Sequence, residues 1–530
     1  MRKYIVENMA FSLSSCSAVT AVTVVTLLLI AQTVPPTEGA NILFFIGFGG
    51  PSHRIGMMPL INGLADEGHN VTFLGKEKPD DKDSKITYFL PKKMVEHFTR
   101  MGATGTGLNM YGLRAGDPEY LDFLKSNKFD LVVVDALFNE CAYGIAHVNK
   151  AKIVLFSVST VLPWAGETLG MPDESSTIPD VMMHFPVPMS FFNRVYNAIR
   201  PVFWKILRET FYLPKLTTIT KEALGLEEFP EFEDLERNIS LAFVNTHVAQ
   251  EFPRSLAPNV VPIGGMSWVE KRKPLPKDIE DFINRGKEGF FYVSFGSFID
   301  FLTFPDEVQQ KFITALKRFP NIQFIWKLNK TPDNLPKNFY VDKWLPQQEI
   351  LLHPKIRAFI THSGIGGVNE AIFSSVPMIC FPLFAEQDYN ADLVELKGFG
   401  IKMEITNLIV EDLENAILKL LGDKTYSKNA KKVSQQFQDR PLTPLQTGLW
   451  WTNFVLRQES TDYIRPASVY QSWWVKRQLD VWLFILLLLI SINSLTIYVV
   501  FKLFKRCTSG SSTPKLSSVN KSKAGKKKQN

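Results

Sequence analysis

The chain has 530 residues, of which 45% are hydrophobic and 21% are charged. This length is too great for one hydrophobic core, so we expect two large domains in a globular protein with some membrane-embedded length. The net charge is +6, but residues 504–530 contain eight Lys or Arg and no acid, so the positive excess belongs to a tail and does not indicate nucleic-acid binding.

The N-terminal residues 1–40 are predicted to be a signal peptide. Arg2 and Lys3 precede an apolar run over residues 18–31, and small residues and prolines follow. Of the four cysteines, two lie in this leader and in the tail, so a disulfide framework is not expected. Cys141 and Cys380 are predicted to be buried free thiols.

A first domain is predicted over residues 41–263, opening with a strand at 41–46, a helix to residue 68 and a strand at 71–74. The turn after the first strand, Gly-Phe-Gly-Gly-Pro-Ser-His, lies where parallel sheets place ligands. Its spacing is not G-x-G-x-x-G, so the glycines alone do not indicate a dinucleotide. By composition alone, His53 in this turn is more often a surface or capping side chain.

A D-x-D pattern occurs at Asp81-Lys82-Asp83 and would suit a metal-bound diphosphate. Charged residues and a proline surround it, which is typical of a solvated loop and not of a strand end. We therefore predict no metal site.

The apolar stretch 129–135 is predicted to be a buried strand that ends in Asp135, which can cap a helix beginning at Ala136. A helix is predicted over residues 139–148, and another strand over residues 152–157. Residues 160–235 are rich in Pro, Phe and Met without a steady period, and a ligand pocket is expected mostly there. Within them, residues 186–207 are either an amphipathic stretch that contacts the ligand or a bilayer, or a helical insertion that covers the core. Asn238 lies in the sequon expected to carry a glycan.

Residues 264–277 are a predicted linker, and a second domain follows over residues 278–460. Its apolar runs alternate with helical patterns, which predicts a parallel sheet. The strand over residues 289–294 ends in a Phe-Gly-Ser turn that offers Ser297 to a phosphate.

The stretch 342–387 of this domain carries the most chemical information. A strand at 356–361, a His-Ser-Gly-Ile-Gly-Gly turn and a helix from Val368 form a site that favours phosphate. Such a turn alone is more often an ordinary connection. The same stretch, however, also supplies an indole, a carboxylate and polar groups suited to a nucleotide sugar, namely Trp344, Gln347, Glu370, Glu386 and Gln387.

A juxtamembrane segment is predicted over residues 461–480 and a membrane-spanning helix over 481–503, because residues 481–501 are uncharged. Lys502, Lys505 and Arg506 follow at once, which places the tail 504–530 in the cytosol and the domains in the lumen. The terminal Lys527-Lys528 pair resembles a dilysine retrieval signal, which favours the endoplasmic reticulum membrane. A basic patch at a membrane surface is the alternative.

The stretch 342–387 resembles the donor-binding signature of the UDP-glycosyltransferases, specifically the membrane-bound UDP-glucuronosyltransferase type. The parts of that signature occur in order along the stretch: W-L-P-Q, H-P-x-x-R-A-F-I-T-H-x-G, the helix Glu, P-x-x-x-x-P-L-F and an acid–Gln pair. The resemblance implies an α/β fold of the GT-B class, with two Rossmann-like domains facing a cleft. It also implies an inverting transfer from a UDP-sugar to a small lipophilic acceptor, with the UDP-sugar as co-substrate and no cofactor. The pocket expected within residues 160–235 would then bind the acceptor.

The resemblance also assigns roles. His53 is the general base, and Asp135 holds it. Ser297, His362 and the Gly364 turn bind the diphosphate. The remaining donor contacts are Trp344 and Gln347 to the nucleoside, Glu370 to the ribose hydroxyls, and Glu386 and Gln387 to the sugar.

Two departures from the family pattern bear on the donor sugar: Glu386 stands where Asp is usual, and Gly366 where the mammalian enzymes have Asn. Glucuronate, in a detoxifying transferase, is the favoured sugar, and glucose on small molecules or lipids is the alternative. A non-catalytic membrane protein of this fold and a homo-oligomer both stay open.

Overall fold

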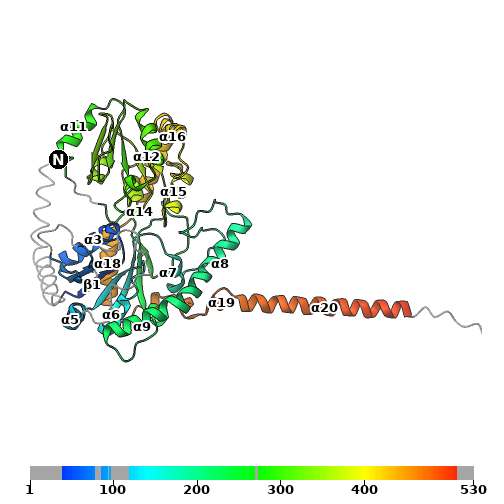
Figure 1. Ribbon diagram of the computed structural model, residues 1–530. Helices are drawn as coiled ribbons and strands as arrows, with labels where there is room; N and C mark the ends of the chain where they lie inside the picture. The colour runs from blue at the N-terminus through cyan, green and yellow to red at the C-terminus, as the bar shows by residue number, and fades with distance from the viewer. Residues whose placement is uncertain (1–38, 78–84, 93–94, 97–117, 269–272, 510–530) are drawn as a thin grey trace, which may run out of the picture. The chain divides into compact units, whose positions relative to one another are not determined.

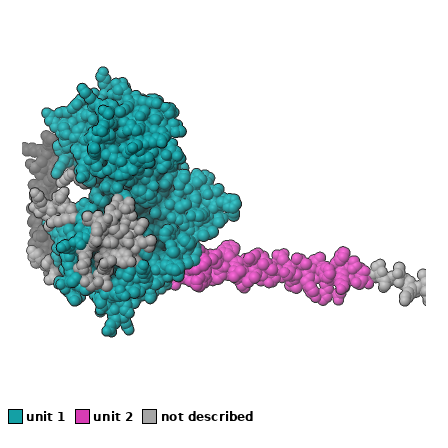
Figure 2. All heavy atoms as spheres, viewed as in Figure 1, with its two compact units in different colours: residues 1–469 teal, residues 470–530 magenta. Residues whose placement is uncertain are grey.

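The structure, a computed structural model, describes residues 39–77, 85–92, 95–96, 118–268 and 273–509 (Figure 1). Contacts divide the chain into two compact units, residues 1–469 and 470–530 (Figure 2). Nearly all of the predicted signal peptide, the Asp81-Lys82-Asp83 loop and most of the basic tail lie outside the described residues. The predicted domain boundaries stay predictions.

The first sheet of unit 1 contains seven parallel strands within the described residues, in the order β3-β2-β1-β4-β5-β6-β7. The strands are β1 (Asn41–Ile46), β2 (Asn70–Gly75), β3 (Thr87–Phe89), β4 (Leu131–Asp135), β5 (Lys152–Ser157), β6 (Ile239–Val244) and β7 (Val260–Pro262). Phe44 of β1 is in register with Phe73 of β2 and Val133 of β4. Because successive side chains point to opposite faces, Phe44 and Phe45 enter hydrophobic clusters on the two faces of the sheet.

Helices and loops connect these strands. They are α3 (Pro51–Asp66), α5 (Pro118–Ser126), α6 (Ala142–Asn149), α7 (Pro163–Thr168), α8 (Phe191–Leu207), the π-helix η3 (Arg208–Tyr212), α9 (Leu213–Leu224) and α10 (Phe232–Arg237). The predicted insertion thus contains a long helical run, α8-η3-α9, which continues at the surface of the unit (Figure 1).

The second sheet of unit 1 contains six parallel strands among the residues described, in the order β10-β9-β8-β11-β12-β13. The strands are β8 (Phe290–Ser294), β9 (Gln323–Lys327), β10 (Phe339–Asp342), β11 (Ile356–Thr361), β12 (Met378–Cys380) and β13 (Gly400–Lys402). The helices around them are α11 (Lys277–Arg285), the 3-10 helix η4 (Phe301–Thr303), α12 (Asp306–Lys317), α13 (Gln347–Leu351), α14 (Ile365–Phe373), α15 (Gln387–Leu396), α16 (Val410–Gly422) and α17 (Lys424–Gln438).

Helix α18 (Pro444–Arg457) follows the second sheet in sequence but packs against α3 of the first (Figure 1). Val455 is fully buried in the cluster that also holds Leu60 of α3. A Cβ at Gly63 would lie 3.0 Å from the Leu449 side chain, so the two helices meet closely at this glycine. The last helix of unit 1 therefore joins the two sheet domains into one body. The 3-10 turn η5 (Asp462–Ile464) follows α18.

Two boundaries differ from those predicted. The helix expected over residues 139–148 begins at Ala142, and Asp135, which could have capped a helix from Ala136, accepts a hydrogen bond from the Leu137 amide in a turn. The helix expected from Val368 begins three residues earlier, at Ile365, because Gly366 and Gly367 are helical and not part of the turn.

The 3-10 turn η6 (Ala467–Tyr470) spans the boundary between the two units in the sequence. Unit 2 then contains α19 (Trp473–Lys476) and α20 (Leu479–Ser509). Among the described residues, α20 is the one helix long and apolar enough to cross a membrane, and it includes the span predicted from the sequence.

Candidate active site

A cavity of about 890 Å³ is formed at the carboxyl ends of the two sheets of unit 1. This is the edge at which parallel α/β sheets bind their ligands. All ten predicted catalytic and donor-binding residues line it: His53, Asp135, Ser297, Trp344, Gln347, His362, Gly364, Glu370, Glu386 and Gln387. Residues more than 300 positions apart in the sequence are thus brought to one place.

The first sheet contributes a His–Asp pair to this cavity. His53 lies in the first turn of α3, and its Nδ1 is 2.5 Å from Oδ2 of Asp135 at the end of β4. The other oxygen of Asp135 accepts the Leu137 amide at 2.8 Å, and Asp135 is 1% exposed. Gly49 has a φ of +146°, and a Cβ there would lie 3.0 Å from the His53 ring, so only glycine leaves room for it.

Asn139 fixes the two turns that carry this pair. Its Oδ1 accepts the Phe48 amide at 2.6 Å, and its Nδ2 donates to the Phe48 carbonyl at 2.9 Å and the Leu137 carbonyl at 2.8 Å. Asn139 is itself buried. One side chain therefore links the backbone beside His53 to the backbone beside Asp135.

The charges around His53 set its proton affinity. Burial lowers the pKa of His53, but the charge and hydrogen bond of Asp135 outweigh burial, so the pKa lies above its ordinary value of 6.5. Glu386, from the second sheet domain, adds to this rise, and Lys76 opposes it. Burial raises the pKa of Glu386, whereas His53 lowers it. The two domains thus contribute electrostatically coupled groups to one site.

The second sheet contributes an imidazole packed between two glycines. A Cβ at Gly296 would lie 2.6 Å from the His362 ring, and a Cβ at Gly364 would also lie 2.6 Å from it. Burial and the charge of Lys327 lower the pKa of His362 to about 4, so the ring is neutral at physiological pH. A neutral imidazole can donate one hydrogen bond to a phosphate oxygen without adding a charge.

The turn after β11 leads into the N-terminus of α14, which no side chain caps. A helix N-terminus carries partial positive charge and unpaired N–H groups, which favour an anion. A Cβ at Gly366 would meet no atom within 4 Å, so this first turn is open on that side. Ser297, on the neighbouring turn after β8, is exposed in the same cavity.

Glu370, on α14, is held by two amides. Gln347 and Gln348 each donate to one of its carboxylate oxygens, Gln348 at 2.7 Å, and Tyr292 donates to the Oε1 of Gln347 at 3.0 Å. Because each carboxylate oxygen has two acceptor positions, Glu370 retains capacity for ligand hydroxyls. Nearby, Trp344 is 65% exposed, which leaves its indole available for stacking.

Gln387, the first residue of α15, is almost completely buried, and its Oε1 accepts the Leu383 amide at 2.9 Å. This bond shapes the loop that presents Glu386, the N-cap residue of α15.

Three residues of the site were not predicted from the sequence. Lys327, at the end of β9, donates to the Gly296 carbonyl at 2.6 Å and lies 5.3 Å from the centre of the Trp344 ring. Lys76, after β2, lines the cavity beside Glu77, and Asn139 follows β4. Each lies at or just beyond the carboxyl end of a parallel strand, and that position is the signal that could have identified them.

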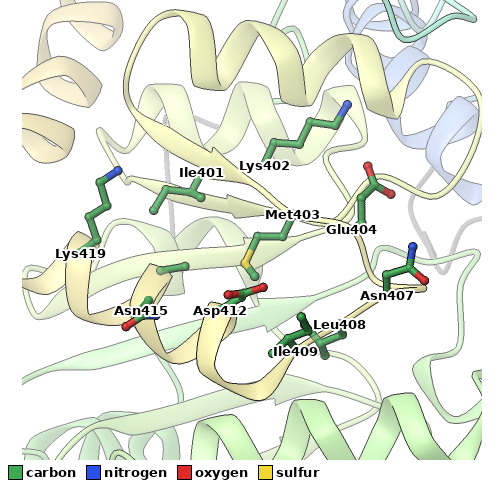
Figure 3. Close-up of a pocket in the computed structure, with 11 residues that line it drawn as sticks. Ile401, Lys402, Met403, Glu404, Asn407, Leu408, Ile409, Asp412, Asn415 and Lys419 are labelled. Carbon is green, nitrogen blue, oxygen red and sulfur yellow. The ribbon is translucent and has the colours of Figure 1, made fainter.

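In the described part of the chain, neither a metal-binding group nor the second hollow of the surface offers an alternative site. Among the residues that the structure describes, no three His, Cys, Asp or Glu side chains form a metal-binding group. A hollow of about 380 Å³ lies beside β13 and α16 (Figure 3) and contains none of the predicted site residues.

The comparisons with known proteins agree with this geometry. The model of the UDP-glucoronosyl and UDP-glucosyl transferase family matches residues 114–513. The chain belongs to this family. Among its relatives, UDP-glucosyltransferase 2 of Dactylopius coccus is 29% identical, covering 92% of this chain and 98% of its own. UDP-glucuronosyltransferase 1-2 of Rattus norvegicus is 31% identical, covering 91% and 94%. The protein is thus a UDP-glycosyltransferase, an enzyme and not a non-catalytic protein of this fold.

Solved structures confirm the predicted fold. The spinosyn forosaminyltransferase SpnP is 16% identical with a TM-score of 0.56, and covers 80% of this chain and 100% of its own. The glycotransferase of kitacinnamycin is 16% identical with a TM-score of 0.54, covering 81% and 100%. The enzyme therefore has the GT-B fold of two facing α/β domains, with one C-terminal apolar helix that fits a single-pass membrane anchor.

Proposed function

We propose that this glycosyltransferase moves a sugar from UDP to a hydroxyl group of a small lipophilic acceptor, with inversion at the anomeric carbon. His53 is the general base. It accepts the acceptor's proton, and Asp135 holds the ring by its Nδ1 and stabilises the imidazolium that forms. The observation that carries this proposal is the 2.5 Å contact between His53 and Asp135 in the cavity lined by the donor-binding residues.

The donor is assigned to the second sheet domain. Trp344 stacks on the uracil, Gln347 contacts the nucleoside, and Glu370 accepts the ribose hydroxyls. The diphosphate lies at Ser297, His362 and the Gly364 turn, supported by the N-terminus of α14 and without a metal ion. Glu386 and Gln387 contact the sugar.

Support for a single in-line step comes from the placement of these groups. The base lies on the first sheet domain and the leaving diphosphate on the second, so acceptor and leaving group approach the anomeric carbon from different domains. The acceptor oxygen forms its bond as the bond to UDP breaks, and the donated proton rests on His53.

The acceptor side of the cavity supports a lipophilic molecule. Its walls in the first domain are largely apolar: Phe48, Ile55, Leu137, Val158, Leu162 and Met182. Small phenols are the first acceptors to test. Activity on a ceramide-like lipid alone would instead assign the enzyme to lipid glycosylation.

A His53→Ala variant tests the base. We expect transfer to be lost while UDP binding, measured by calorimetry, is unchanged, because His53 is absent from the donor site. His147→Ala is the matched control, since His147 is exposed and lies outside the cavity. Near-normal turnover by His53→Ala would make the assignment of the base wrong.

Glucuronate is the proposed donor sugar, and a nearby cation would favour its carboxylate. Lys76 lines the cavity and its charge lowers the pKa of His53, which supports Lys76 as that cation. A neutral hexose is the second candidate, because Glu386 and Glu77 bring negative charge to the same region. A carboxylate there would meet repulsion that a hydroxymethyl group avoids.

UDP release measured with UDP-glucuronate and UDP-glucose separately distinguishes the two donors. If glucuronate is used, Lys76→Gln should lower its kcat/KM by roughly ten-fold and leave residual glucose transfer unchanged, as expected for one charged contact. Release with glucose alone would identify a glucosyltransferase.

The cellular setting is part of the proposal. The enzyme is a type I protein of the endoplasmic reticulum membrane with lumenal domains, and it acts in detoxification. Asn238, which is exposed at the end of α10, carries a glycan. Loss of a glycosidase-sensitive mass shift in Asn238→Gln would support this orientation, and an unmodified wild-type chain would contradict it.

A further inference from the structure

Helix α15 follows β12 of the second sheet, but its side chains enter the cores of both sheet domains. Ala391 and Val394 lie in a hydrophobic cluster of the second domain. Tyr389 and Leu393 lie instead in a cluster of the first domain, which also contains Leu162 of the cavity wall. Residues four positions apart share one face of a helix, so this face of α15 is buried in the first domain.

A buried hydrogen bond fixes this contact between the domains. The Tyr389 hydroxyl donates to Oε1 of Glu251, which lies between β6 and β7, and both side chains are buried. The Tyr389 ring also meets the ring of Phe252 edge to face, with 5.1 Å between the ring centres. Burial raises the pKa of Tyr389 well above its ordinary value of 10, and the charge of Glu251 raises it further. The phenol therefore keeps its proton and remains a donor.

A cluster of ion pairs supports α15 further along the same helix. Oδ2 of Asp392 lies 2.8 Å from Nδ1 of His184, which belongs to the first domain. Within the second domain, Lys402 pairs with Asp392 at 3.0 Å and with Asp388 at 2.7 Å. Because the His184 side chain is more than half exposed, its pair with Asp392 is screened by water and holds the domains less firmly than the buried bond of Tyr389.

The N-terminal end of α15 reaches the cavity. Glu386 is its N-cap residue and Gln387 its first residue, and both line the cavity. Asn390, which is buried, donates to the Ser363 carbonyl at 3.0 Å and so joins α15 to the turn after β11. Tyr389 lies between these groups in the sequence. A displacement of α15 would therefore move both the residues assigned to the sugar and the turn assigned to the diphosphate.

We propose that Tyr389 and Glu251 are positioning residues for sugar transfer. Their bond aligns the donor groups of the second domain with His53 and the acceptor wall of the first. The rate of an in-line step depends steeply on the alignment of the reacting atoms, and a small misplacement lowers this rate without weakening the binding of either substrate. The inference rests on the proposed placement of the acceptor on the first domain and of the donor on the second.

Tyr389→Phe in the full-length enzyme tests the proposal, because it removes the hydroxyl and keeps the ring. We expect kcat for transfer to a small phenol to fall roughly ten-fold. The donor KM and the Kd of UDP, measured by calorimetry, should stay unchanged, since every proposed donor contact is retained. Tyr340→Phe is the matched control: the Tyr340 hydroxyl donates to Asp278 at 2.6 Å within the second domain and outside the cavity. This control should have the kcat of the wild type.

A double variant separates positioning from stability. Tyr389→Phe leaves the Glu251 carboxylate buried without this partner, so the Tm should fall. Adding Glu251→Gln removes the buried charge, so the Tm should recover while kcat stays low. Recovery of kcat together with the Tm, or an unchanged kcat in Tyr389→Phe, would overturn the positioning role. A rise in the Kd of UDP that matches the fall in kcat would also overturn it.

Failure of the proposed function would appear in a different variant. His53→Ala would then keep near-normal turnover, whatever the kcat of Tyr389→Phe. An inactive His53→Ala together with a wild-type kcat in Tyr389→Phe would overturn the positioning role alone.

Discussion

Asp135→Asn tests whether the buried carboxylate sustains the reaction through His53. The substitution keeps the size of the side chain but removes its charge, 2.5 Å from Nδ1 of His53. The pair is buried, and removing one partner of a buried pair costs about 3–5 kcal/mol. Because the imidazolium forms in the transition state, this loss converts to a fall in kcat of roughly 10²- to 10⁴-fold.

The same variant should move the pH profile. His53 accepts a proton only when neutral, so the rate rises as pH passes upward through its pKa. Burial lowers this pKa and Asp135 raises it above 6.5, so the wild-type acid limb has its midpoint above pH 6.5. Without the carboxylate, burial and Lys76 dominate. The pKa falls, and the acid limb moves to lower pH as the plateau drops.

Steady-state UDP release between pH 5 and 9 measures both effects. Only pH values at which the enzyme stays folded and binds UDP with constant affinity are used. Asp130→Asn is the matched control, because Asp130 is exposed and accepts the Asn41 amide outside the cavity. A plateau within ten-fold of the wild type, or an acid limb that moves to higher pH, would refute the assigned role of Asp135.

Four further predictions follow from the described contacts. Asn139→Ala removes both bonds to Phe48, so kcat should fall roughly ten-fold with an unchanged donor KM; an equal rise in KM would contradict a positioning role. Glu370→Gln should raise the Kd of UDP, measured by calorimetry, roughly 10- to 100-fold, since bonds to a charged group contribute about 1.5–3 kcal/mol; an unchanged Kd would remove Glu370 from the ribose site. Gly366→Ala should not lower the Tm, because its Cβ meets open space, yet should weaken UDP binding; unaltered UDP affinity would place the diphosphate away from α14. Chelation of divalent ions should leave the rate unchanged, and restoration of a lost rate by Mg²⁺ would contradict a metal-free site.

The parallel sheets were predictable because their strands are continuous apolar runs bounded by glycine or by polar residues. β1, β5 and β11 have the predicted limits, and the last four side chains of each strand are buried. The helix after β4, predicted from residue 139, begins at Ala142 because a turn follows Asp135, and Asp135 could locally satisfy either a helix or a tight turn. The hydrogen bonds of Asn139 to Phe48, which select the turn, join residues 91 positions apart.

The candidate site was predictable where its chemistry is local in sequence, and not where it depends on the assembly of the two sheets. The stretch 342–387 was recognisable because the whole donor-binding signature that it resembles lies in one continuous β-α segment. In the sequence, Lys327 is an ordinary lysine at the end of a strand. Only the fold shows that it lies beside Trp344 and Gly296. The apolar face of α8 was readable as a pattern, but only the buried bonds of Asn197 show that this face points outward. Rotating α8 to bury that face would break those bonds, and a buried polar group without a partner is costly. The direction of the face is therefore decided by contacts between α8 and the segment that precedes it, which the local pattern of residues does not reveal.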